Sequence, residues 1–120
     1  MNEYLGTLMQ SRNQAHIYHL QTSSYAKHIA LNEYYDEIIN LIDSVAEAYQ
    51  GKYEIIKGYK MVGSLKDLGE EDEIISYLEQ IAKYCELKRE KLPQDGFLTN
   101  IYDDIDTLLR STVYKLKRLS

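Results

Sequence analysis

The chain has 120 residues, of which 44% are hydrophobic and 28% are charged, and its net charge is −5. These values are typical of one globular domain and exclude a broadly basic nucleic-acid-binding surface. One proline and six glycines provide too few turns for an all-β fold, and no apolar run reaches the ~20 residues of a membrane span. The single cysteine, Cys85, excludes an intrachain disulfide, so we expect a cytoplasmic protein.

Apolar residues recur with the period of an α-helix in four segments, which predicts an all-α fold with four helices. In chain order the segments cover about 3–20, 24–50, 71–92 and 97–118. Gly51 is expected to end the second helix, and Pro93 and Gly96 to separate the third from the fourth.

The lengths of the connections predict the directions of the helices. The turns at about 21–23 and 93–96 are short, so the helices on either side of each turn should run antiparallel. The connection at about 51–70 could reach ~60 Å when extended, enough to cross a helix of ~40 Å. We therefore expect the second and third helices to be parallel, with a partly helical crossover packed through Tyr53, Ile55 and Ile56. An up-down bundle with one long loop is the alternative.

Four side chains that can bind a metal ion lie in the first half of the chain: His16, His28, Asp43 and Glu47. Asp43 and Glu47 are four residues apart and share a helix face. His28 and Asp43 lie fifteen residues apart on one predicted helix, which separates them by about 22 Å. One site can therefore contain all four only if two subunits pair their second helices antiparallel about a two-fold axis near 35–39.

These residues match most of a longer pattern, His-x11-His-x3-Asp-x10-Asp-x2-Ala-Glu preceded by Gln-Ala, over about 35 residues (13–47). The chain departs from it at Asn32, which replaces the middle Asp, and at Ile17, where a Trp is usual. The pattern resembles that of the Dps proteins, the ferritin-like mini-ferritins, including short phage-encoded members. The segment 97–116 loosely resembles the last helix of that family, and the middle of the chain is similar in composition only.

The resemblance implies one ferritin-like four-helix bundle over residues 1–120 and a homo-oligomer, up to a shell of twelve subunits. It also implies an inter-subunit iron site and a ferroxidase that oxidises Fe(II) with peroxide or dioxygen. Asp43 and Glu47 would be the main ligands and His16 and His28 of the partner the secondary ones. Asn32, His19 and Asp36 would be weaker ligands. A phage-encoded member would act in the cytoplasm of its bacterial host.

Two other functions remain open. Asn32 is neutral and a poorer iron ligand, so the chain could form a ferritin-like structural assembly with a degenerate site. It could also be a helical interaction module for a host or viral partner. DNA binding is not expected, because the first eleven residues contain no Lys or Arg and the basic residues near the end suit the last turns of a helix.

Tyrosine is frequent, with twelve residues against one Phe and no Trp. Tyr18, Tyr25, Tyr34 and Tyr35 lie near the candidate ligands and could relay an oxidising equivalent, but filling of the core and interfaces is their more usual role. Cys85 lies on an apolar stripe, which predicts a buried hydrophobic side chain and not a nucleophile.

Overall fold

The computed structural model describes residues 1–61 and 63–119 and confirms an all-helical chain. Its helices are α1 (Asn2–Gln21), α2 (Tyr25–Lys52), α3 (Asp72–Lys88) and α4 (Gly96–Arg118), with one 3₁₀ turn at Arg89–Lys91. None of the helices among the described residues is both long and apolar enough to cross a membrane.

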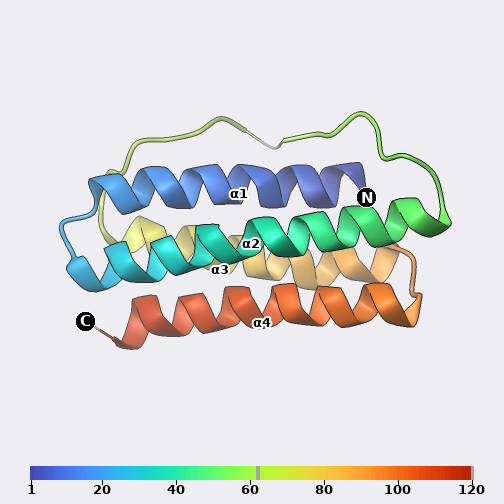
Figure 1. Cartoon of the computed structure of the whole chain (residues 1–120). Helices are drawn as coiled ribbons and strands as arrows, with labels where there is room; N and C mark the ends of the chain where they lie inside the picture. Colours follow the sequence, from blue (N-terminus) through green and yellow to red (C-terminus); the bar gives the residue numbers. More distant parts are fainter. Residues whose placement is uncertain (62, 120) are drawn as a thin grey trace.

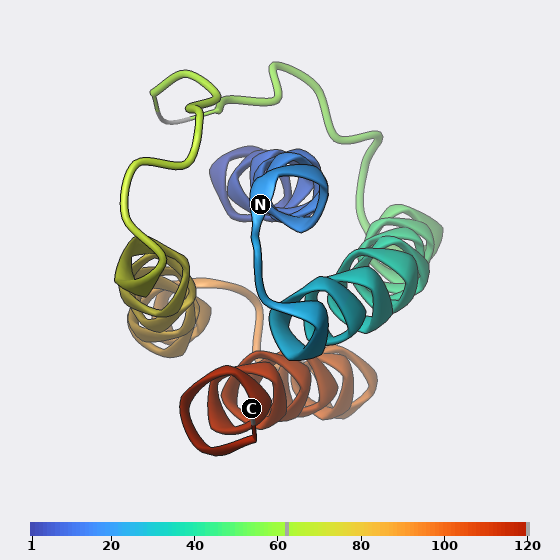
Figure 2. The same ribbon diagram turned by 90° about the vertical axis from the view of Figure 1, so that its left-hand side faces the viewer.

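The direction of each helix follows the prediction from the loop lengths. α1 and α2 are antiparallel, and the chain then returns along the outside of α1, so that α3 starts at the same end as α2 (Figure 1). α2 and α3 are therefore parallel, and the up-down alternative is wrong. Seen end on, the helices follow one another around the core in the order α1, α2, α4 and α3 (Figure 2). Every neighbouring pair is antiparallel.

Tyrosines fill much of the core. Tyr4, Tyr34 and Tyr102 are fully buried, and the rings of Tyr4 and Tyr102 pack edge to face with centroids 5.7 Å apart. The Tyr34 hydroxyl lies 2.7 Å from Ser11 Oγ, which itself donates a hydrogen bond to a backbone carbonyl of α1. This hydrogen bond offsets the cost of burying the Tyr34 hydroxyl, so Ser11 on α1 helps to set where the ring of α2 can sit. Cys85 is buried and free, as expected.

Two helix ends differ from the prediction. Gly51 lies inside α2, which continues to Lys52, where the ammonium group pairs with Asp95 before α4. This tertiary contact outweighs the weak tendency of glycine to end a helix. α3 ends at Lys88 and one 3₁₀ turn replaces its expected last turn. Leu92 is extended (φ −98°, ψ 165°), because the proline that follows it disfavours helical backbone.

The crossover, residues 53–71, contains no helix in its described part, so the expectation of a partly helical segment is wrong. Ile56 is buried, whereas Tyr53 and Ile55 are exposed. Hydrogen bonds with helix side chains hold it instead, mainly with α1 but also with Gln50 of α2 and Glu73 of α3. Gln14 binds both backbone groups of Lys66 at 2.8 Å, and a backbone that is paired in this way does not need to be helical.

Glu71 ties the start of α3 to the turn between α1 and α2. Its carboxylate accepts hydrogen bonds from the Ser23 backbone N–H at 2.9 Å and the Thr22 hydroxyl at 2.7 Å. These bonds, the backbone one first, lower the pKa of Glu71 to about 2. The end of the crossover is thereby held against the turn that separates two of the candidate histidines.

Candidate metal site on the outer face of α1 and α2

The candidate ligands lie on one outer face, here called the α1–α2 face. On α2 they occupy an arc of about 100°, at 100° per residue. The face is defined by His16 and His19 of α1 and by His28, Asn32, Ile39, Asp43 and Glu47 of α2.

Asp43 and Glu47 are exposed on the second half of α2, four residues apart as predicted. Neither carboxylate forms an ion pair within the described residues. Two carboxylates on successive turns of one helix can approach the same cation. This half of the face therefore has the negative charge that a divalent metal requires.

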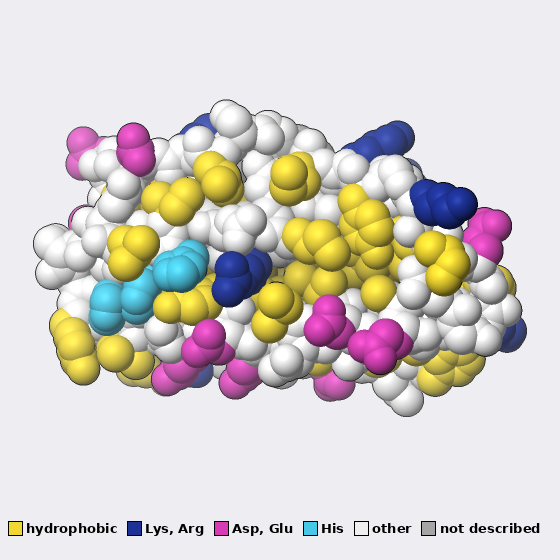
Figure 3. Space-filling model, turned by 45° about the horizontal axis from the view of Figure 1, so that its top comes forward, with side chains coloured by type: hydrophobic (Ala, Val, Ile, Leu, Met, Phe, Trp, Pro, Cys, Tyr) yellow, Lys and Arg dark blue, Asp and Glu magenta, His cyan; other side chains and the backbone are white. Residues whose placement is uncertain are grey.

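All three histidines of the chain gather at the other end of the face, where they form one patch on the surface (Figure 3). The rings of His19 and His28 stack with centroids 3.7 Å apart, and those of His16 and His19 lie 5.9 Å apart. His16 also stacks on Tyr35 at 4.4 Å. The histidine that sequence ranked lowest, His19, is thus the centre of the group and is buried.

A reciprocal pair of hydrogen bonds orients two of the rings. His19 Nδ1 lies 2.7 Å from the carbonyl oxygen of His28, and His28 Nδ1 lies 2.8 Å from the carbonyl oxygen of His19. A carbonyl oxygen only accepts, so each Nδ1 carries the hydrogen. In the neutral ring the lone pair is then on Nε2, the arrangement in which a carbonyl fixes the orientation of a metal-binding histidine.

Asn32 is held by its own helix. Its side-chain oxygen accepts a hydrogen bond of 2.6 Å from the Tyr35 hydroxyl, and its amide group donates one of 3.1 Å to Asp36. The side-chain oxygen is the only atom of Asn32 that could bind a metal ion, and the bond from Tyr35 occupies one of its lone pairs. The exposed carboxylate of Asp36 is fixed beside it, which makes Asp36 the nearest negative charge to the place where the resemblance expects an Asp.

One chain does not bring these groups together. The described residues hold no cluster of three or more His, Cys, Asp or Glu side chains able to bind a metal ion. α2 is continuous from Tyr25 to Lys52, so the expected separation of about 22 Å between His28 and Asp43 stands. A site made of all four residues thus requires a second chain, and that pairing stays a prediction.

Large apolar side chains lie uncovered between and beside the two groups of ligands (Figure 3). Ile29 is 39% exposed and Ile39 42%, and Tyr25 near the histidines is 78% exposed. Tyr18, Tyr34 and Tyr35 are buried, so of the four tyrosines near the ligands only Tyr25 does not fill the core. Apolar side chains interspersed with ligands are typical of a contact surface.

The family model of a family of unknown function (DUF5856) matches residues 19–116. Over 66 residues the chain is 38% identical to an uncharacterized 14.6 kDa protein in the mobD-ri intergenic region of Enterobacteria phage T4. The alignment covers 55% of this chain and 48% of the phage protein, so the chain spans about half the length of that relative. The expected similarity to phage proteins is confirmed to this extent. No solved structure matches the chain.

Proposed function

Because the chain belongs to a family of unknown function (DUF5856), its chemistry must be inferred from its own residues; we propose that it binds and oxidises Fe(II) at a site shared by two copies. Asp43 and Glu47 of one copy bind the iron together with His16 and His28 of the other. The bundle is then ferritin-like and the biological unit contains a two-fold pairing of α2.

One observation carries this proposal. On α2 the candidate ligands lie at opposite ends of one outer face. His28 and Glu47 are equally far from a point between residues 37 and 38, and so are Asn32 and Asp43. An antiparallel pairing that sets His28 opposite Glu47 of the partner copy also sets Asn32 opposite Asp43 of that copy. The two-fold axis generates two equivalent sites from this single contact.

The topology supports the same proposal. Parallel α2 and α3 joined by a long crossover are what a ferritin-like bundle requires. The pairing would also cover Ile29 and Ile39, which are about two-fifths exposed in one copy. Burial of such side chains stabilises an interface by about 25 cal/mol per Å² of apolar area.

The ligand set suits iron as a substrate. Two carboxylates offset the charge of a divalent ion, and neutral imidazoles add nitrogen donors that Fe(II) accepts and that Mg²⁺ and Ca²⁺ do not favour. Oxidation of two Fe(II) by one hydrogen peroxide consumes two protons and yields two Fe(III) and two waters. Asn32 adds no charge and already accepts a bond from Tyr35, so a second iron should bind weakly and this two-electron step should be slow.

The same hydrogen bonds favour a second candidate function, a ferritin-like structural assembly in which the site no longer oxidises iron. The Asn32 amide is satisfied by Tyr35 and Asp36 without any metal. In that case the two-fold pairing persists although iron oxidation is lost.

Anaerobic titration with Fe(II), followed by addition of peroxide, tests the proposal. Wild type should bind about one Fe(II) per site, Glu47→Ala should abolish binding and oxidation, and Asn32→Asp should accelerate oxidation, because each change alters the negative charge at the site. Glu90→Ala, on the 3₁₀ turn outside this face, is the matched control and should behave as wild type. If Glu47→Ala leaves binding and oxidation unchanged, the iron proposal is wrong. Binding without oxidation in wild type would favour the structural assembly.

A further inference from the structure

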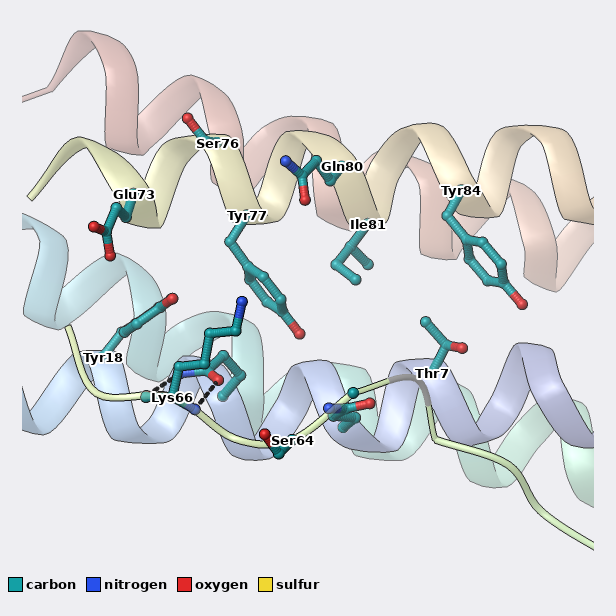
Figure 4. A pocket seen from close by; sticks show the side chains of 13 residues that line it. Thr7, Tyr18, Ser64, Lys66, Glu73, Ser76, Tyr77, Gln80, Ile81 and Tyr84 are labelled. Carbon is teal, nitrogen blue, oxygen red and sulfur yellow. Dashed lines mark hydrogen bonds between the residues drawn. The ribbon is translucent and has the colours of Figure 1, made fainter. Parts of the chain in front are cut away.

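A cavity of about 550 Å³ lies between α1, α3 and the crossover (Figure 4). The residues of α1 that line it occupy a different side of that helix from His16 and His19. This volume is within the range of about 300–1,000 Å³ usual for small-molecule sites. The proposed iron chemistry does not use any residue that lines it.

The crossover forms one wall of the cavity and is fixed in place there. The side-chain amide of Gln14 on α1 donates a hydrogen bond to the backbone carbonyl of Lys66 and accepts one from its backbone N–H, both at 2.8 Å. Gln21 likewise accepts a bond of 2.7 Å from the Leu68 backbone N–H. These hydrogen bonds hold the crossover against α1, so this wall of the cavity has a defined position.

Two amides remain available. Gln10 of α1, which is 8% exposed, and Gln80 of α3 both line the cavity. Within the described part of the chain neither side chain forms a hydrogen bond to protein. Each amide offers both donors and an acceptor, which is the combination that recognises the edge of a planar heterocycle.

Aromatic rings form the wall on the side of α3. Tyr77 and Tyr84 project from α3 towards α1, and Tyr18 meets Tyr77 edge to face with centroids 5.9 Å apart (Figure 4). Burial raises the pKa of Tyr77 above its usual value, so its hydroxyl stays a hydrogen-bond donor at neutral pH. Stacking on such rings favours a planar ligand and is tolerant of its identity.

Two charged side chains, Glu73 and Lys66, are among the residues that line the cavity, and they differ in how free they are to bind a ligand. Glu73 accepts a hydrogen bond of 3.1 Å from the Gly69 backbone N–H. The Lys66 side chain extends towards the tyrosines (Figure 4) and forms no ion pair within the described residues. A ligand that carries one anionic group can therefore place it at Lys66.

We propose that this cavity binds a nucleoside monophosphate. The base stacks on the tyrosine wall with its edge towards Gln10 and Gln80, and the phosphate pairs with Lys66. A purely apolar ligand is a poorer fit, because it would leave the amides of Gln10 and Gln80 in the lining without a hydrogen-bond partner. Free phosphate is also a poor fit, because the exposed Lys66 is the only cation among the described residues that line the cavity.

Calorimetric titration of the metal-free full chain with AMP, GMP, CMP, UMP, adenosine and inorganic phosphate tests this. At least one monophosphate should bind with a Kd below about 1 mM, more tightly than phosphate. Gln80→Leu should weaken it about tenfold, because a base edge then faces an apolar side chain. Gln80 is exposed, so this change should leave the fold intact.

Lys66→Met tests the contribution of the phosphate group to binding separately from that of the base. It should weaken the monophosphate severalfold and leave adenosine unchanged, while Lys83→Met on the exposed side of α3 is the matched control and should alter neither. The proposal is overturned if no monophosphate binds at millimolar concentration, if phosphate alone binds as well, or if both lining variants bind as wild type. None of these results depends on iron binding.

Discussion

Gly6 lies inside α1 where the crossover passes closest, and its replacement by Ala tests how that segment is held. An ideal Cβ at this position would lie 2.0 Å from the carbonyl oxygen of Lys60 and 2.7 Å from its carbonyl carbon. The obstacle is backbone, which cannot turn aside as a flexible side chain can. Gly6→Ala therefore forces the crossover away from α1 by roughly 1 Å or more and weakens the contact between Lys60 and Asn2.

The expected magnitude is the difference of two effects. Ala gains about 1 kcal/mol over Gly inside a helix, whereas overpacking costs about 1–3 kcal/mol. Gly6→Ala should lower the free energy of unfolding by about 1 kcal/mol. Gly51→Ala is the matched control, because Gly51 is also helical and its Cβ would meet nothing within 4 Å. That change should be neutral or stabilising by up to about 1 kcal/mol.

Urea unfolding followed by far-ultraviolet circular dichroism measures both variants, and limited trypsin digestion reports on the lysines of the crossover. We expect faster cleavage at Lys57 and Lys60 in Gly6→Ala than in Gly51→Ala, because the displaced segment is more accessible. A Gly6→Ala protein that is as stable and as resistant as Gly51→Ala would refute the close contact between α1 and the crossover.

Two further predictions concern charged groups. The pKa of Glu71 is lowered to about 2 from 4.5, so its bonds to Thr22 and Ser23 stabilise the fold above pH 4.5 and this contribution is lost as the pH falls towards 2. Glu71→Gln should cost about 1 kcal/mol at pH 7, discounted for solvent exposure, and should flatten acid unfolding curves over that range; an unchanged curve would contradict this. Arg89 Nη1 lies 2.8 Å from Asp106, whose pKa is raised by burial, so Arg89→Met should cost about 2–3 kcal/mol at pH 7 by leaving that carboxylate without its partner. Part of the loss should return as the pH is lowered, because protonation of Asp106 removes the charge that has lost its partner. A urea midpoint with the same deficit at neutral and at acid pH would be inconsistent with the pairing.

The helices and their directions could be predicted from the sequence, because apolar periodicity and loop length are local properties. The path of the crossover could not, because it depends on contacts such as those of Gln14 with Lys66, which are 52 residues apart. The need for a glycine at position 6 of α1 could not be predicted, because it arises from the backbone of Lys60, which is distant in the sequence. Gly51, which looked like a helix end, is helical because Lys52 gains a partner in Asp95.

For the candidate site, the sequence placed Asp43 and Glu47 correctly on one exposed face, since their spacing alone decides it. Sequence reasoning ranked His19 below the other two histidines, although its ring lies between theirs. His19 and His28 lie within a turn or so of the two helix ends that flank a short connection, and this position was the available signal that they would meet. The hydrogen bonds of Asn32 follow from spacings of three and four residues and could have been anticipated. The cavity could not, because its walls come from three distant segments.

A site shared by two copies is tested most directly by complementation. The double variants His16→Ala/His28→Ala and Asp43→Ala/Glu47→Ala are each measured alone and after unfolding and refolding together in equal amounts. Half of the pairs formed at random contain one chain of each kind, and in these one of the two sites is intact. We predict that peroxide-dependent Fe(II) oxidation is weak in each variant alone and rises in the mixture to about a quarter of the wild-type value. A mixture whose activity is only the average of the two variants would contradict a site formed between α2 of one copy and the histidines of another.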